Sequence, residues 1–144
     1  MDIHFGDKIE IKAQIEKVRS LATNMKEVSE CIPDLQDFMQ ADEKNFTMKI
    51  KAGIAFVQGV FSIKGSMNAQ GNSINYLMEG KGIGSTVRIN LSVKISSTGQ
   101  STYAAWEADA SIGGIAGGVS EGVIMKISED KIGEIIENVR KKLE

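Results

Sequence analysis

The sequence has few of the residues that build disulfides, metal centres or nucleophilic active sites. Its 144 residues include one cysteine, one histidine, one proline and one tryptophan. A single cysteine excludes an internal disulfide, which agrees with a cytoplasmic protein. One cysteine and one histidine also cannot complete the usual zinc ligand set. We therefore expect neither a metal site nor an intrinsic cofactor.

The residue types that could serve catalysis do not come together in the sequence. His4 lies on a predicted strand and, by alternation, points away from Ile3 and Phe5 toward solvent. Cys31 has no histidine near it in the sequence, so a buried structural thiol is favoured over a nucleophile. The glycine-rich segment 80–84 joins two strands and opens no helix, which excludes a phosphate cradle. We therefore predict that the protein is not an enzyme.

Neither charge nor hydrophobicity is concentrated in one region. The 17 basic and 19 acidic residues give a formal net charge of −2, which leaves no basic excess for binding nucleic acid. The sequence begins without the apolar run of a signal peptide, and no stretch reaches the roughly 18 apolar residues that span a bilayer. Residues 140–142 are basic, and we interpret them as complementing the dipole of a final helix rather than as a site for anionic lipid. We expect one domain covering residues 1–144.

The periodicity of apolar residues changes once along the chain. Between Phe46 and Ile112 nearly every second residue is apolar, which is typical of an antiparallel sheet with one apolar and one solvated face. From about Ile115 to Leu143 the spacing is helical, so we expect a long helix that covers the apolar face. Its glycine-rich first turns are expected to fray or break. The other predicted elements are strand 2–12, helices 14–22 and 24–31, and strand 35–41, which makes an α+β fold.

Four short turns keep the apolar residues of successive strands on one face. The predicted two-residue turns are 58–59, 71–72, 83–84 and 98–99, all of which contain glycine. They predict the inner pairs Phe56 with Phe61, Met67 with Tyr76, Leu91 with Trp106, and Val93 with Ala104. On the solvated face the last turn sets Arg88 opposite Asp109.

The predicted inner face mixes large apolar residues with small ones such as Gly65 and Ala108. The small residues either let the helix and its glycines 117, 118 and 122 lie close to the sheet, or leave an apolar cavity for a hydrophobic ligand. Trp106 carries an N–H that needs a partner, for which a backbone carbonyl is favoured over a ligand oxygen. Tyr76 is the better candidate for orienting a ligand.

A ligand in such a cavity would contact nine residues on the inner face or at its lip. The glycine-rich start of the last helix would form the moving lip. The nine candidate ligand-binding residues are Phe56, Phe61, Gly65, Met67, Tyr76, Met78, Leu91, Trp106 and Val119.

Four short motifs follow one another in a specific order over nearly the whole chain. They are Cys31-Ile32-Pro33, Lys51-Ala52-Gly53-Ile54 leading to Gly59-Val60-Phe61, Glu79-Gly80-Lys81-Gly82, and residues 106–114 running into the last helix. Together they resemble the carbon monoxide dehydrogenase CoxG family, which belongs to the START-like, helix-grip superfamily (SRPBCC). The resemblance implies a seven-stranded antiparallel sheet wrapped around a long C-terminal helix, two short helices after the first strand, and a hydrophobic tunnel between sheet and helix.

The resemblance also carries expectations about function. Members of the family are associated with molybdenum-containing carbon monoxide dehydrogenases and related hydroxylases, with proposed roles in membrane anchoring and in carrying a quinone. It therefore implies a non-catalytic carrier of a quinone-like or lipid-like molecule, accessory to such a hydroxylase. The sequence ends at Glu144 without the C-terminal extension of membrane-attached members, so we expect at most peripheral contact with the inner face of the membrane. Two alternatives stay open, a small START-like enzyme of cyclase type and a docking protein that binds no ligand.

Overall fold

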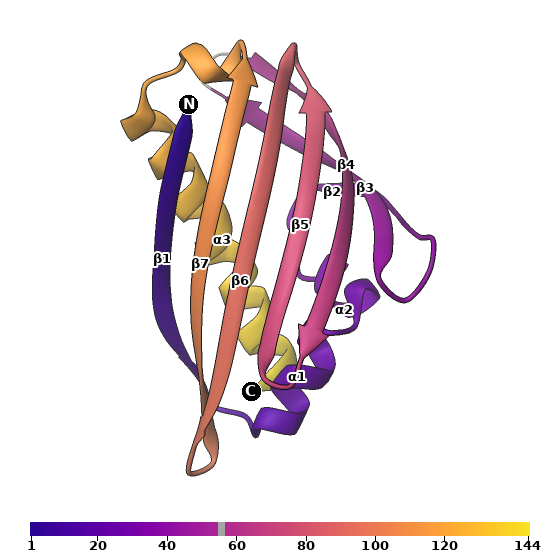
Figure 1. The fold of residues 1–144 in the computed structure, drawn as a ribbon, viewed down its shortest axis with the longest axis vertical. Helices are drawn as coiled ribbons and strands as arrows, with labels where there is room; N and C mark the ends of the chain where they lie inside the picture. Colours follow the sequence, from indigo (N-terminus) through magenta and orange to yellow (C-terminus); the bar gives the residue numbers. More distant parts are fainter. Residues whose placement is uncertain (55–56) are drawn as a thin grey trace.

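A single curved sheet with one long helix across it dominates the structure (Figure 1). The computed structural model describes residues 1–54 and 57–144. Over these residues the seven strands are β1 (Asp2–Ile11), β2 (Leu35–Gln40), β3 (Asn45–Ile54), β4 (Val57–Gln70), β5 (Ser73–Gly82), β6 (Ser85–Thr98) and β7 (Ser101–Gly114). The helices are α1 (Ile15–Ala22), α2 (Met25–Ser29), the short 3-10 helix η1 (Ala116–Gly118) and α3 (Glu121–Leu143). The predicted α+β class is confirmed.

The sheet is antiparallel throughout, in the order β1-β7-β6-β5-β4-β3-β2. Only β1 departs from sequence order, because it pairs with the last strand. Met67 faces Tyr76 as predicted, and the loop between them begins at Gly71, whose φ of 59° suits a tight hairpin. The alternation of apolar and polar residues therefore does correspond to two faces of one sheet.

The hairpin of β3 and β4 differs from the prediction. Phe61 faces Ile50, so residues 58–59 lie inside β4 and the predicted turn there is wrong. The predicted pairing of Phe61 with Phe56 is wrong for the same reason, and Phe56 itself lies outside the described residues. The glycine at 59 answers a tertiary need instead, because a Cβ there would lie 3.0 Å from a side-chain atom of Ile83.

The last hairpin is also shifted from the prediction. Its observed inner pairs are Leu91 with Ala108 and Val93 with Trp106, in place of Leu91 with Trp106 and Val93 with Ala104. Thr98 pairs with Ser101, so the loop is 99–100, one residue later than predicted. Gly99 takes a φ of 62° at the first loop position, a conformation that glycine adopts without steric cost.

This shift also changes the solvated face. Arg88 faces Ser111 rather than Asp109, so the predicted pair is wrong. The Arg88 guanidinium instead lies 3.2 Å from the Glu79 carboxylate on the neighbouring strand β5.

The helix boundaries follow local capping chemistry. The Asn24 side chain accepts a hydrogen bond from the Glu27 N–H at 3.2 Å and so begins α2, as predicted. The predicted C-terminal helix is broken near its start, as its glycines led us to expect, into η1 and α3. Ser120 begins α3 by accepting a hydrogen bond from the Val123 N–H at 3.4 Å.

Three buried clusters occupy the concave side of the sheet. The first contains Ile11, Val18, Leu21, Ile95, Ala104 and Leu143. The second lies beneath α2 and contains Met25, Phe46, Met48, Met67, Ile74 and Tyr76. The third, at the opposite end of α3 from the first, contains Ile3, Ala110, Ile112, Ala116 and Ile124. The long helix is thus anchored to the sheet near both of its ends.

Candidate functional site

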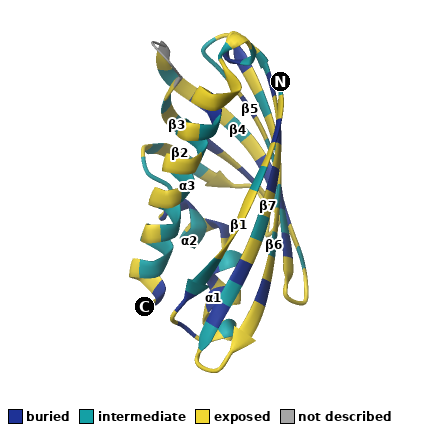
Figure 2. Ribbon diagram, turned by 90° about the vertical axis from the view of Figure 1, so that its left-hand side faces the viewer, coloured by how far each residue is buried: buried dark blue, intermediate teal, exposed yellow. Residues whose placement is uncertain are grey.

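Between its two anchored ends, α3 passes over apolar side chains that are not fully buried. On the sheet these partly exposed residues are Met78, Ile89, Leu91, Val93 and Trp106. On the helix Ile132 and Ile135 are also partly exposed and belong to none of the three clusters in the described part of the chain. Figure 2 shows no fully buried residue along the middle of α3, in contrast to the sheet ends. The middle of the helix and the sheet beneath it are therefore not in close contact.

The glycines of the last helical segment do not bring α3 close to the sheet. A Cβ added at Gly118, Gly122 or Gly133 would meet no described atom within 4 Å beyond the helix's own backbone. Gly117 differs, because a Cβ there would lie 2.9 Å from the Ile112 carbonyl oxygen. Close packing of helix on sheet therefore explains Gly117 and leaves the other three without a packing role.

The small residue at position 65 has a clear packing role. A Cβ at Gly65 would collide with the ring of Phe46, which is 1% exposed and is the largest side chain of the second cluster. The space above this glycine is thus filled by an aromatic ring. Of the small residues on the sheet, Ala108 is the one that lies midway along β7 beside the partly exposed side chains.

The structure brings the described candidate residues to the concave side or to its rim. Phe61, Gly65, Met67 and Tyr76 are buried, whereas Met78, Leu91, Trp106 and Val119 are partly exposed. Phe56 lies outside the described residues. The residues missing from the candidate set are Phe5, Ile89, Ile132 and Ile135, all of which show the apolar periodicity of their element.

The rim near η1 is fixed at its first residues. The N–H of Ile115 donates to the Gly84 carbonyl at 3.1 Å, and the N–H of Ala116 donates to the Ser85 hydroxyl at 2.9 Å. The Ile115 side chain is nevertheless 61% exposed, and Val123 at the start of α3 is 42% exposed. Any movement of this rim must therefore occur after Ala116, where the glycines 117 and 118 lie.

Tyr76 is committed to the fold. Its hydroxyl donates a hydrogen bond to the carbonyl of Ala22, the last residue of α1. Burial raises the pKa of the Tyr76 phenol well above its ordinary value, so it stays protonated. This hydrogen bond uses its only donor.

Trp106 has no such partner. Its Nε1 is buried, and no described residue offers it an acceptor, so the backbone carbonyl that we predicted as its partner is wrong. Its ring meets that of Phe5 edge to face, with centroids 5.7 Å apart and planes at 85°. It is the one buried side-chain nitrogen or oxygen without a partner among residues 1–54 and 57–144.

The reactive residue types lie away from this region. Cys31 is buried, and desolvation raises the pKa of its thiol, as fits a structural residue. His4 is exposed, as predicted, and its Nδ1 lies 2.6 Å from a carboxylate oxygen of Asp109. Within the described ranges, no three His, Cys, Asp or Glu side chains gather as a metal site would require. Nor do those ranges contain a helix long and apolar enough to cross a membrane.

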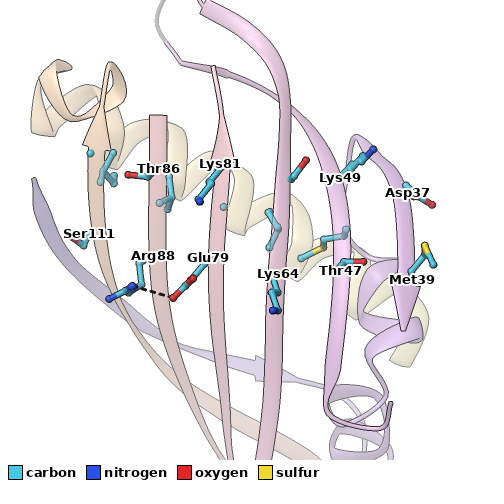
Figure 3. Close-up of a pocket in the computed structure, with 17 residues that line it drawn as sticks. Asp37, Met39, Thr47, Lys49, Lys64, Glu79, Lys81, Thr86, Arg88 and Ser111 are labelled. Atoms are coloured by element: carbon cyan, nitrogen blue, oxygen red, sulfur yellow. Dashed lines mark ion pairs between the residues drawn. The ribbon is translucent and has the colours of Figure 1, made fainter. Parts of the chain in front are cut away.

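The outer face of the sheet carries a second feature, a groove of about 870 Å³ (Figure 3). Four cationic residues line it, namely Lys49, Lys64, Lys81 and Arg88. Four hydroxyl residues lie between them, namely Thr47, Ser62, Thr86 and Ser111. Arg88 is paired with Glu79, but none of the three lysines lies in an ion pair with another described residue. The sequence pattern places these side chains on the solvated face but does not predict the groove, which depends on how the sheet bends.

Several solved structures share this architecture. A conserved protein from Geobacillus kaustophilus has a TM-score of 0.88 at 18% sequence identity, covering 99% of this chain and 94% of its own. A START superfamily protein from Mycobacterium smegmatis has a TM-score of 0.76 at 11% identity, covering 97% and 96%. The Zhui aromatase/cyclase from Streptomyces sp. R1128 has a TM-score of 0.74 at 9% identity, covering 99% and 93%. These similarities confirm the predicted START-like fold.

The sequence itself decides the family. No curated protein matches it. The carbon monoxide dehydrogenase CoxG family matches residues 7–144, which include all seven strands at least in part and all three α-helices. The chain therefore belongs to the CoxG family.

Proposed function

We propose that this protein is a non-catalytic carrier that encloses a quinone-like or lipid-like molecule between the sheet and the middle of α3. The observation that supports it is the partly exposed apolar surface on both walls, with Met78 and Leu91 on the sheet and Ile132 and Ile135 on the helix. Apolar surface left open to water is unfavourable by roughly 25 cal/mol per Å², so a hydrophobic molecule that covers it gains affinity. Membership of the CoxG family and the START-like fold both suggest a binding or carrier role.

The second part of the proposal is an accessory role beside a molybdenum hydroxylase of the carbon monoxide dehydrogenase type. The family name supports this partner class. The outer groove is the proposed docking site, because Lys49, Lys64 and Lys81 present positive charge there that is not paired within the described chain. An acidic surface on the partner enzyme would be complementary to it, and such complementarity chiefly speeds association and sets specificity.

Uptake of an apolar probe tests the carrier role. Trp106 is the only tryptophan, so its fluorescence reports on the addition of 2-methyl-1,4-naphthoquinone. Met78 and Leu77 are neighbours on β5, and Met78 points inward whereas Leu77 is 49% exposed on the outer face. We expect Met78→Lys to weaken binding at least about tenfold, because a charge then faces an apolar ligand, and Leu77→Lys to leave it unchanged.

Native mass spectrometry of gently extracted protein complements this titration. A retained apolar molecule supports the carrier. If no apolar molecule is retained and the naphthoquinone does not bind, the carrier role is wrong and a docking protein without a ligand is favoured.

Docking is tested separately on the outer face. Lys64→Glu places an acidic residue in the groove, whereas Lys94→Glu makes the same change on β6 outside it. We expect only Lys64→Glu to weaken binding to a purified hydroxylase of this type, with a loss that is largest at low salt. Equal effects of the two variants would contradict the groove as the docking site.

A cyclase-type enzyme is the rival class, because one structural neighbour is an aromatase/cyclase. Such an enzyme needs polar groups free to act on substrate, and the Tyr76 hydroxyl already donates to the Ala22 carbonyl. Turnover of a ketide that is lost in Tyr76→Phe would establish the enzyme and overturn the carrier.

A further inference from the structure

The buried N–H of Trp106 has no acceptor in the described part of the protein. About nine in ten or more buried polar groups are hydrogen-bonded, so each exception calls for an explanation. An unpaired donor deep in an apolar region is unfavourable, and an incoming acceptor relieves that cost. In a largely apolar binding site, the few polar groups fix the orientation and identity of the ligand.

Trp106 lies where the ligand is proposed to bind. On β7 it stands between Ala104 of the first cluster and Ala110 of the third, and it belongs to neither. Its neighbours on the concave face are Val93, directly opposite on β6, and Phe5, against which its ring packs. The donor is thus at the middle of the sheet, under the loosely packed part of α3.

The other polar side chains around this region are already satisfied. Tyr76 donates to the Ala22 carbonyl, and the Thr102 hydroxyl donates to the Ala13 carbonyl at 2.8 Å. The Ser85 hydroxyl accepts from the N–H of Ala116 at 2.9 Å. Among the described residues, Trp106 therefore supplies the one free buried donor, and these three hydroxyls are not free to accept from a ligand that carries a donor of its own.

The cations near α3 are engaged at its edges. Lys131 pairs with the Asp34 carboxylate at 3.1 Å, and Arg140 donates to the Glu10 carbonyl at 3.0 Å. A ligand carboxylate or phosphate under the middle of the helix would have no opposite charge from these residues beside it, and a buried unpaired charge is strongly unfavourable. A hydrocarbon, conversely, would leave the indole N–H unpaired.

We infer that Trp106 selects the ligand through its indole N–H, and that the ligand is a neutral apolar molecule with a carbonyl-type oxygen, such as a quinone, ketone or ester. This inference rests on the proposed carrier function and narrows its ligand class. The oxygen accepts a hydrogen bond from Nε1. Because Nε1 is covered by protein atoms, the oxygen reaches it by displacing the apolar atoms that lie on it.

The single tryptophan makes a direct test practical. In protein labelled with ¹⁵N, one indole N–H signal reports on Trp106. We expect 2-methyl-1,4-naphthoquinone to move the indole proton downfield and to slow its exchange with solvent. The matched hydrocarbon 2-methylnaphthalene, which has the same rings without the oxygens, should do neither.

Calorimetry on variants separates the hydrogen bond from packing. Trp106→Phe should weaken the quinone about fivefold more than it weakens the hydrocarbon, which is the size expected for one neutral hydrogen bond. Met78→Leu changes the same wall without touching a hydrogen bond, and should affect both probes equally. Decanoate should bind more weakly than the quinone because its carboxylate has no countercharge.

The outcomes distinguish this inference from the function on which it rests. If both probes bind but give the same indole response and lose affinity equally in Trp106→Phe, the selection by Trp106 is wrong and the carrier stands. Binding of decanoate as tight as that of the quinone also overturns it. If no apolar probe binds at all, the carrier function fails and takes this inference with it.

Discussion

The ends of α3 and its middle meet the same sheet in different ways. Near the ends, Ile124 and Leu143 are 4% and 7% exposed and belong to buried clusters. In the middle, Ile132 and Ile135 are partly exposed and join none of the clusters in the described chain. Hydrophobicity does not distinguish the two regions, because three of these four residues are isoleucine. The curvature of the sheet does, since it approaches the helix at both ends and recedes from it between them.

This difference assigns two roles to one helix. The ends stabilise the fold, because side chains there bury their surface against strands and against α1. The middle adds little to stability and leaves apolar surface for another molecule. A carrier needs both properties, since it must stay folded with and without its cargo.

The largest effects should come from truncating the two regions. Ile124→Ala removes a buried side chain and should lower the free energy of unfolding by about 2–5 kcal/mol. Ile132→Ala removes a partly exposed side chain outside the clusters and should cost about 1 kcal/mol. Urea unfolding of the two variants measures both values. Equal losses would mean that the middle of α3 packs on the sheet as tightly as its ends.

Glycine-to-alanine changes sharpen the same contrast with opposite signs. At Gly65 a Cβ collides with the Phe46 ring, so Gly65→Ala should destabilise by about 1–3 kcal/mol. At Gly133 a Cβ meets nothing within 4 Å beyond the helix backbone, so Gly133→Ala should stabilise the helix by about 0.5–1 kcal/mol. Thermal unfolding followed by circular dichroism tests both. A destabilised Gly133→Ala variant would show that something does pack against the middle of the helix.

The faces of the strands could be predicted even where two turns were misplaced. A two-residue loop always pairs odd-numbered with even-numbered residues, wherever along the chain it lies. Moving the loop from 58–59, or from 98–99, therefore changed the partners of Phe61 and Trp106 without turning either residue to the other face. Inward and outward positions are thus local properties, whereas exact pairing depends on tertiary contacts such as that of Ile83 with Gly59.

The candidate site was predictable only in part, for a similar reason. Periodicity identified the apolar inner face that includes Met78, Leu91 and Trp106. It contained no information on which polar groups would find partners across long sequence separations. The Tyr76 hydroxyl meets Ala22, 54 residues away, whereas the Trp106 N–H meets no acceptor among described residues. The outer groove was missed because it arises from bending of the sheet, which alternation does not record.

The smallest predicted effect lies on the outer face, where exposed ion pairs replace buried clusters. His4 lies beside Asp109, and the hydrogen bond between them, with the attraction of the two charges, raises the His4 pKa above its ordinary value of about 6.5. Because the folded pKa is raised, the pair contributes stability below about pH 6.5 and loses it as the pH rises through the folded pKa. Both side chains are exposed, so this contribution is small and screened by salt.

An NMR titration of the single histidine measures this directly. Asp109→Asn should return the His4 pKa toward its ordinary value of about 6.5, because the hydrogen bond then lacks a charged acceptor. Glu107→Gln is the matched control on the same strand, since Glu107 acts on His4 only through weaker charge attraction and should lower its pKa less. A His4 pKa that is the same in Asp109→Asn and in the unchanged protein would contradict the pairing of β1 with β7 in this register, because that register places the two residues opposite each other.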